Sequence, residues 1–241
     1  MNSDKNIPRL LGAAFLFVAA ASALSGLLLG SLGIPTVGSP DNISEAMIKI
    51  SDNPTTMLIS IIVMFIEAIA IVLLAVLLYT TLKRQNKVTA RWAFGLWIIE
   101  AVALAFRGIS AFSLLTVSQE FAKAGSPGSS HFQTLGSLFF GTTQFSLSVL
   151  MVFYCTGGIL FYYLLYKSKY VPRALSLFGI AAASLGLIGT LLEILGYDVP
   201  LVVFLPILPY ELAIGIWLIV KGFNQSVIAS ESAQTDMSKL S

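Results

Sequence analysis

The sequence predicts an all-α, polytopic membrane protein with six transmembrane helices, and two observations carry this prediction. Apolar residues make up 56% of the 241 residues, charged residues make up only 11%, and the mean hydropathy is +0.87, whereas an ordinary soluble domain is about 25% charged. The apolar residues also fall into six long runs. In lipid, backbone amides are satisfied only in helices or closed barrels. The runs lack the alternation of barrel strands, so helices are expected.

Six apolar runs mark the expected spans, and each is long enough to cross a hydrocarbon core of about 30 Å. In chain order they cover residues 10–29 and 55–82, a pair that starts at Trp92 and ends at Tyr166, and residues 174–195 and 201–220. Ala21-Ser22-Ala23 resembles a signal-peptide cleavage site, but a run of about 20 apolar residues favours an uncleaved first helix. We expect a single domain over residues 1–223 and a disordered cytoplasmic tail over residues 224–241.

The connections between the spans differ in length. In the first loop, residues 43–50 are predicted to form a short amphipathic helix on the membrane surface, capped at residues 41–44.

The middle pair of helices is too long for a bilayer, because residues 92–124 alone extend about 50 Å as a helix. We therefore expect the third and fourth helices to project outside as a long hairpin with its tip at residues 125–130. A re-entrant segment is the alternative. The short loop at residues 197–200 makes the last two helices antiparallel neighbours.

The basic residues are distributed unevenly over the connections. Eleven of the 14 Lys and Arg residues lie on one side of a six-helix chain: Lys5, Arg9, Lys83, Arg84, Lys87, Arg91, Lys167, Lys169, Arg173, Lys221 and Lys239. Only Lys49 and Lys123 fall on the other side, and Arg107 lies within a span. The positive-inside rule then places both termini in the cytoplasm and the chain in the cytoplasmic membrane, in contact with the lipid bilayer.

Composition excludes several classes of function. The net charge of +2 is too small to argue for a nucleic-acid partner. A single cysteine, Cys155, excludes an internal disulfide, and a single histidine, His131, is too few for a typical zinc site. The chain has neither a GxxxxGK(S/T) phosphate loop nor a GxGxxG run after a strand. No metal and no cofactor is therefore expected.

Five ionisable residues lie inside the predicted spans. A charge near the bilayer centre costs at least about 2.5–3.5 kcal/mol, so these side chains are expected to face the bundle interior and to have partners. Counting from the cytoplasmic basic residues places Glu100 and Glu211 about 15 Å up, and Glu67 and Arg107 about 24 Å up. Arg107 and Glu67 then form the natural ion pair. Glu193, about 30 Å up, is expected to extend to the outer headgroups.

Two interpretations of this cluster stay open. In the functional one, the carboxyls bind a cation or relay protons, and Arg107 is a counter-charge or an anion site. In the structural one, an Arg–Glu pair locks the second and third helices, and neutral Glu side chains hydrogen-bond across the bundle. In the last span, Pro206 and Pro209 precede Tyr210 and Glu211. They are expected to kink the helix and to free carbonyls beside the Glu211 carboxyl, and the Tyr210 hydroxyl could donate a hydrogen bond to either. A simple packing kink is the alternative.

Several short motifs match the pattern of a known family. They are Phe153-Tyr154, residues 166–175 with Pro172-Arg173, the run from Pro209 and Glu211 to Trp217-Leu218, and the opening Pro8-Arg9-Leu10. In these the chain resembles a prokaryotic integral membrane family catalogued as domain of unknown function 4386. The resemblance implies six helices and no settled activity. The chain departs from the family pattern at Gly157, near which many members carry a histidine.

Three hypotheses for function follow. The first is a bundle that binds and transports a small molecule or ion, linked to protons, along Glu67, Glu100, Arg107 and Glu211, with Tyr210 beside them. The second is a non-catalytic accessory or sensor module whose outer loops bind a partner. The weakest is an intramembrane enzyme with a Glu acid/base, because no nucleophile, metal set or cofactor motif accompanies the carboxyls. Six helices are few for an alternating-access carrier, so a homodimer is an open alternative.

Overall fold

The computed structural model describes residues 3–35, 38, 42–124 and 130–224. Within these ranges every regular element is a helix: α1 (Ser3–Ser31), α2 (Ile43–Asp52), α3 (Pro54–Leu82), α4 (Lys87–Lys123), α5 (Ser130–Ser168), α6 (Arg173–Ile194), the 3₁₀ turn η1 (Leu201–Val203) and α7 (Ile207–Val220). Six segments are long and apolar enough to cross a bilayer: α1, α3, α4, α5, α6 and the stretch formed by η1 and α7. The predicted all-α class with six spans is confirmed, and the outward faces of these spans contact the bilayer.

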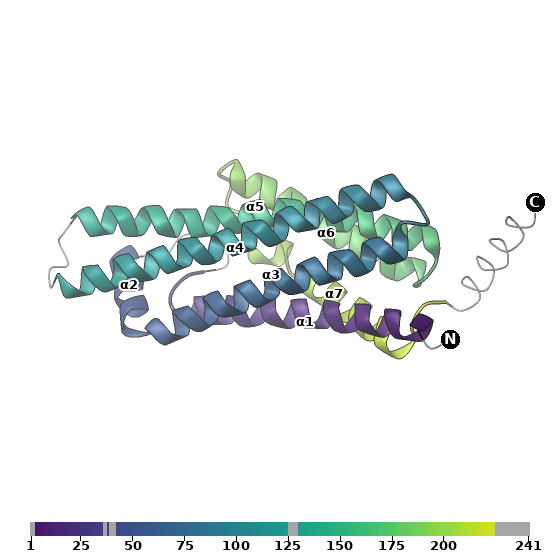
Figure 1. Cartoon of the computed structure of the whole chain (residues 1–241). Coiled ribbons are helices and arrows are strands. Elements are labelled where there is room, and N and C mark those ends of the chain that lie inside the picture. The colour runs from purple at the N-terminus through teal and green to yellow at the C-terminus, as the bar shows by residue number, and fades with distance from the viewer. Residues whose placement is uncertain (1–2, 36–37, 39–41, 125–129, 225–241) are drawn as a thin grey trace, which may run out of the picture.

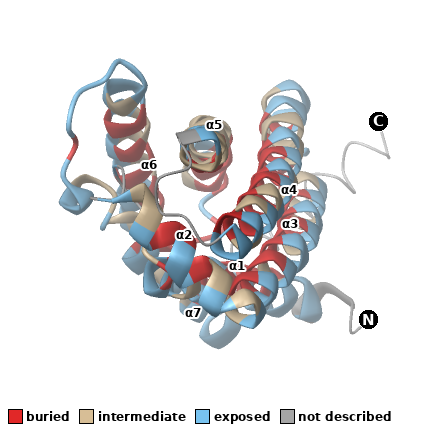
Figure 2. Cartoon of the chain, turned by 90° about the vertical axis from the view of Figure 1, so that its left-hand side faces the viewer, coloured by how far each residue is buried: buried red, intermediate tan, exposed pale blue. Residues whose placement is uncertain are grey.

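The six spanning segments form a closed ring. Each packs against the next in chain order, and α7 returns to α1 (Figure 2). The seam between α1 and α7 is close because both contribute glycine: a Cβ at Gly12 would meet the carbonyl oxygen of Gly215 at 2.6 Å. Small residues allow such close approach between membrane helices. Buried residues gather on the faces that the helices turn toward one another (Figure 2), so the ring has an interior that is shielded from lipid.

The ring has two distinct ends (Figure 1). At the terminal end, α1 begins and α7 ends; at the hairpin end, α4 and α5 extend beyond the other helices. α4 has 37 residues and α5 has 39, which corresponds to about 55 Å or more of helix against a hydrocarbon core of about 30 Å. Both helices are continuous, which removes the re-entrant alternative. Residues 125–129 of the expected tip and residues 225–241 of the expected disordered tail lie outside the described residues.

The first connection forms the expected short helix, α2. Asn42 caps it, because its Oδ1 accepts hydrogen bonds from the backbone N–H groups of Ser44 (3.0 Å) and Glu45 (3.4 Å). Its apolar face, which includes the fully buried Met47, packs chiefly on α4 and also on α5. Gln133 of α5 donates from Nε2 to Oγ of Ser44 at 3.0 Å. The helix expected on the membrane surface is therefore a brace across the base of the projecting hairpin.

The sixth span is interrupted rather than kinked. After η1 the chain turns, and α7 starts at Ile207 with Pro206 at its N-cap and Pro209 in its first turn. A proline in the first turn costs little, because the first N–H groups of a helix have no intrahelical partner in any case. A break before the helix thus replaces the expected kink within it. The 14 residues of α7 extend about 21 Å, so this helix begins inside the membrane.

Candidate functional site

Four of the five ionisable residues predicted inside the spans are buried in the ring. Glu67 on α3, Glu100 and Arg107 on α4, and Glu211 on α7 are between 4 and 8% exposed. They face the interior because the hydrocarbon outside offers no partner for a charge. The fifth, Glu193 on α6, is half-buried and lines an outer groove. The four interior residues fall into the two layers that their depths along the helices predict.

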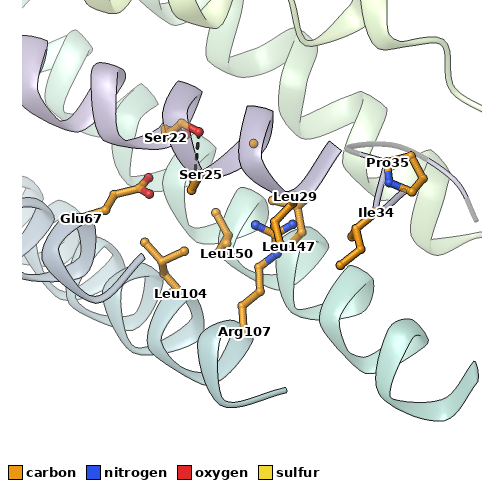
Figure 3. Close-up of a pocket in the computed structure, with 11 residues that line it drawn as sticks. Ser22, Ser25, Leu29, Ile34, Pro35, Glu67, Leu104, Arg107, Leu147 and Leu150 are labelled. Carbon is orange, nitrogen blue, oxygen red and sulfur yellow. Dashed lines mark hydrogen bonds between the residues drawn. The ribbon is translucent and has the colours of Figure 1, made fainter. Parts of the chain in front are cut away.

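The layer nearer the hairpin end contains Glu67 and Arg107, which line one cavity of about 80 Å³ among α1, α3, α4 and α5. We call it the Arg107–Glu67 cavity. Ser22 and Ser25 of α1 line the same cavity as the Glu67 carboxyl, and Ser25 Oγ donates to the carbonyl oxygen of Ser22 at 3.0 Å (Figure 3). One water molecule needs about 10–15 Å³ of such space. The cavity therefore has room for several waters or for one small solute.

Glu67 and Arg107 do not form the expected ion pair. Among the described residues, the one salt bridge within 4.0 Å joins Lys123 to Glu120, at 2.8 Å, on the exposed part of the hairpin. The Nε of Arg107 instead donates to the backbone carbonyl of Thr143 on α5, at 3.3 Å. The prediction of a direct Arg–Glu pair is wrong because depth along the helix does not determine how the two side chains are turned.

Apolar side chains separate the two charges. Leu104 of α4 and Leu150 of α5 line the cavity, and Figure 3 shows them between the Glu67 carboxyl and the Arg107 guanidinium. Oε2 of Glu67 is buried and has no hydrogen-bond partner within the described part of the chain. Leaving a buried polar atom without a partner costs about 1–3 kcal/mol. The cavity thus holds unused hydrogen-bonding capacity next to charges of both signs.

The second layer, which we call the Glu100–Glu211 layer, is closely packed. Its two carboxyls border a void of only about 10 Å³ together with Trp97 and Tyr154, which is at the lower limit for one water molecule. The Tyr154 hydroxyl on α5 donates to Oε1 of Glu211 at 2.8 Å. Oε2 of Glu100 has no hydrogen-bond partner among the residues described. Glu100 and Glu211 lie within electrostatic range of each other, so this layer brings two carboxyls to one small void but leaves no room for a solute.

Aromatic packing keeps this layer closed. Nε1 of Trp97 donates to the carbonyl oxygen of Tyr154 at 3.1 Å, and the two rings stack with centroids 6.1 Å apart. Gly157 makes room for the indole, since a Cβ there would meet Cδ1 of Trp97 at 2.5 Å. Gly157, near which the family resemblance implies a histidine, is therefore covered by the Trp97 ring.

Tyr210 packs rather than donating a hydrogen bond. Its ring lies edge-on to Tyr162, with centroids 4.6 Å apart, and to Phe178 at 5.9 Å. Gly179 leaves the space that this ring occupies. The Tyr210 hydroxyl has no hydrogen-bond partner among the described residues. The expected bond from Tyr210 to a freed carbonyl or to Glu211 is absent, and a tyrosine from α5 bonds to the carboxyl instead.

An outer groove opens beside the Arg107–Glu67 cavity on the hairpin side. It measures about 350 Å³, lies between α5 and the turn after α6, and has Glu193 and Asp198 among its lining residues. Leu147 of α5 lines both this groove and the cavity. Gln144, almost one turn earlier, donates from Nε2 to the carbonyl oxygen of Pro35 at 2.8 Å and so ties the end of the α1 connection to α5. The Leu147 side chain therefore borders both the groove and the cavity.

The sequence model of one family matches residues 10–222, which span the chain from α1 through α7. Its description is a domain of unknown function, DUF4386. The chain belongs to this family. The resemblance seen in the sequence is thereby confirmed, and the match covers all six spans and both charge layers of this DUF4386 protein. Comparison with curated proteins and with solved structures finds no match. The family description carries no activity, so the site geometry alone supports a function.

Sequence reasoning missed four polar partners in this DUF4386 protein: Ser22, Ser25, Thr143 and Tyr154. A signal for some of them existed in their depth. Ser22 follows Arg9 by thirteen residues and Tyr154 precedes Lys167 by thirteen, which places both about 20 Å from the basic residues, between the two charge layers. No group of three or more His, Cys, Asp or Glu side chains suited to a metal ion occurs in the described part of the chain.

Proposed function

We propose that the DUF4386 protein binds a small solute or ion inside its helix ring and moves it across the membrane together with protons. The observation that carries the proposal is the convergence of four ionisable side chains, each more than nine-tenths buried, from three helices on one interior. Burying a charge costs several kcal/mol unless it is paired. A purely structural lock would pair Arg107 with Glu67, whereas these two side chains stay apart and share a cavity.

Glu100 and Glu211 are the groups that exchange protons in this proposal. The void between them is too small for a solute, whereas a proton needs only oxygen atoms within hydrogen-bonding reach. Tyr154 extends this path, because its hydroxyl bonds to Glu211. Glu67 lies within electrostatic range of both carboxyls, so a change of charge in the cavity alters the proton affinity of the layer below it. This coupling is what links a solute to protons.

The proposed orientation places both termini in the cytoplasm and the hairpin end outside, in the cytoplasmic membrane. The support is the concentration of basic residues in the connections at the terminal end. Two of these cations lie over aromatic rings, as is typical of a headgroup boundary: Lys83 over Tyr79 at 5.8 Å and Arg173 over Tyr166 at 5.1 Å from the ring centroids. Labelling of single cysteines placed at residues 86 and 197 in intact cells tests this orientation, because only the second should react with an impermeant reagent.

Proteoliposomes containing a trapped pH dye test the function. Under an imposed pH gradient, the wild-type protein should carry a proton flux above that of empty vesicles. Glu100→Gln and Glu211→Gln should each abolish it, because an amide cannot take up a proton. Glu193→Gln, at the outer groove, is the matched control and should retain the flux. If both interior variants only lower the unfolding temperature and the wild type shows no flux, the buried residues have a structural role alone.

A second candidate function is that of an accessory or sensor module. The observation that favours it is the α4–α5 hairpin, which reaches beyond the hydrocarbon core and is braced by α2. A partner, which includes a second copy of the chain in a homodimer, would bind there. Replacing residues 117–131 with a short Gly/Ser turn should abolish co-purification of that partner and leave the proton flux intact. Loss of the flux without loss of any partner would contradict this candidate.

A further inference from the structure

The Arg107–Glu67 cavity presents a basic and an acidic side chain that do not meet. Both side chains are 6% exposed, both line the same space, and their nitrogen and oxygen atoms are more than 4.0 Å apart. Two opposite charges attract by about 4 kcal/mol at 4 Å in a typical protein environment. A buried charge without a partner is strongly unfavourable. A molecule that carries both charges would supply each side chain with its missing partner.

Each of the two groups has free hydrogen-bonding capacity. Thr143 accepts from Nε of Arg107, which leaves the terminal guanidinium nitrogens without a partner among the described residues. These nitrogens match the two oxygens of a carboxylate. Oε2 of Glu67 is likewise without a partner, and the hydroxyl oxygens of Ser22 and Ser25 lie beside it. Three acceptors in one place suit the three donors of an ammonium group.

We propose that this cavity binds a small zwitterion with one ammonium and one carboxylate group. The carboxylate bonds to Arg107, the ammonium bonds to Glu67 and the two serines, and the short carbon chain contacts Leu104 and Leu150. A solute with a single charge would leave the opposite side chain buried and unpaired. The proposal rests on the proposed function, because it names the class of solute that this function requires.

Volume and net charge define the class further. A cavity of about 80 Å³ accommodates a molecule of a few heavy atoms and excludes a peptide or an aromatic amino acid. A zwitterion has no net charge, so it passes the acidic residues of the outer groove, Glu193 and Asp198, and approaches Arg107 without net repulsion from either. Glycine, β-alanine and 4-aminobutyrate carry the same two charges at increasing separation. The one that binds most tightly therefore indicates the distance between the Arg107 and Glu67 side chains.

Thermal unfolding of the full chain in lipid nanodiscs tests the proposal. The probes are the three zwitterions, acetate as the anion alone and ethylammonium as the cation alone. At a concentration near 100 times its dissociation constant, at least one zwitterion should raise the unfolding midpoint by about 5 °C or more. Acetate and ethylammonium at equal concentration should leave it unchanged. Stabilisation by acetate as large as that by any zwitterion would overturn the proposal.

Two charge-removing variants give a readout that a merely structural role would not produce. In Glu67→Gln, zwitterion binding should weaken about tenfold or more, and acetate should now stabilise the protein through Arg107. In Arg107→Gln, ethylammonium should gain the same effect through Glu67. These gains of binding also show that each variant is folded. Glu193→Gln is the matched control and should keep the wild-type preference. Absence of both gains, together with no zwitterion shift in the wild type, refutes the site.

The failure of this proposal is distinguishable from failure of the proposed function. If the proton flux depends on Glu100 and Glu211 while no zwitterion shifts the unfolding midpoint, the class of solute is wrong and proton-linked transport stands. If a zwitterion binds as described and no proton flux is found, the binding site is supported and the transport function is contradicted.

Discussion

The two layers of buried charge differ in what surrounds them. Around Glu67 and Arg107 the ring leaves about 80 Å³, lined by hydroxyls and leucines, whereas around Glu100 and Glu211 aromatic rings leave about 10 Å³. The first layer holds an arginine and a glutamate apart, and the second holds two carboxyls at one small void. In the proposed function, space therefore decides the role of each layer: the layer with a cavity binds the solute, and the packed layer exchanges protons.

Chemical access should show the largest difference between the layers. Cys155 is fully buried and lies within electrostatic range of Glu100 and Glu211, whereas Ser25 lines the Arg107–Glu67 cavity, which Leu147 also borders. In a Leu147→Ala background, Ser25→Cys should be modified completely by a small methanethiosulfonate reagent, because the truncation enlarges the space where the cavity and the outer groove share a lining residue. Mass spectrometry reads the modification. Cys155 should stay unmodified under the same exposure. Equal modification of both cysteines would show that the two layers do not differ in chemical access.

Added volume should also separate the two layers. Gly157→Ala places a methyl group against the Trp97 ring and should lower the free energy of unfolding by about 1–3 kcal/mol through overpacking. Gly26 on α1 lines the cavity, and a Cβ there has no neighbour within 4 Å. Gly26→Ala should therefore raise the free energy of unfolding by about 0.4–1 kcal/mol. Denaturation in detergent micelles measures both, and an equal loss in both variants would show that the cavity is as tightly packed as the second layer.

Two tyrosines sharpen the comparison within the packed layer. Tyr154→Phe removes the donor to Glu211 and should cost about 1–2 kcal/mol, because a buried carboxyl oxygen loses its partner. Tyr210→Phe removes a hydroxyl that has no partner among the described residues. It should change the free energy of unfolding by less than about 0.5 kcal/mol. Thermal unfolding of both variants under one set of conditions checks this. A larger loss of stability in Tyr210→Phe than in Tyr154→Phe would contradict the assignment of a bonded hydroxyl to Tyr154 and an unbonded one to Tyr210.

The smallest effect is expected outside the ring. Lys123 and Glu120 form an exposed ion pair on α4, and such pairs contribute at most about 1 kcal/mol. Lys123→Ala should therefore shift the free energy of unfolding by about 0.5 kcal/mol or less, and high salt should remove the difference. A large, salt-independent loss would indicate that this part of the hairpin is buried against another molecule.

Features set by distance along the chain could be predicted from the sequence. Hydropathy identified the six spans, because a run of apolar residues must be as long as the bilayer core is thick. Counting residues from the basic loops placed Glu100 level with Glu211, although these two residues lie on the third and the last of the five helices around their void. Both follow from the constant rise of the α-helix.

Features set by rotation about the helix axes could not be predicted. Lipid tails are as apolar as a protein core, so inward and outward positions carry the same residue types: on α3, Ile61 is 5% exposed and Ile69 is 72% exposed. Nothing in the sequence therefore indicated that Arg107 turns toward Thr143 and away from Glu67. The position of Pro206 was also ambiguous, because a proline is equally compatible with a bend inside a helix and with a helix start.

The glycine seam between α1 and α7 has a consequence for biogenesis. These two helices are far apart in the sequence, so the ring stays open on one side until α7 packs against α1. A chain without α7 would lack the helix that supplies Glu211 to the void beside Glu100. Docking of α7 is thus the step that closes the ring.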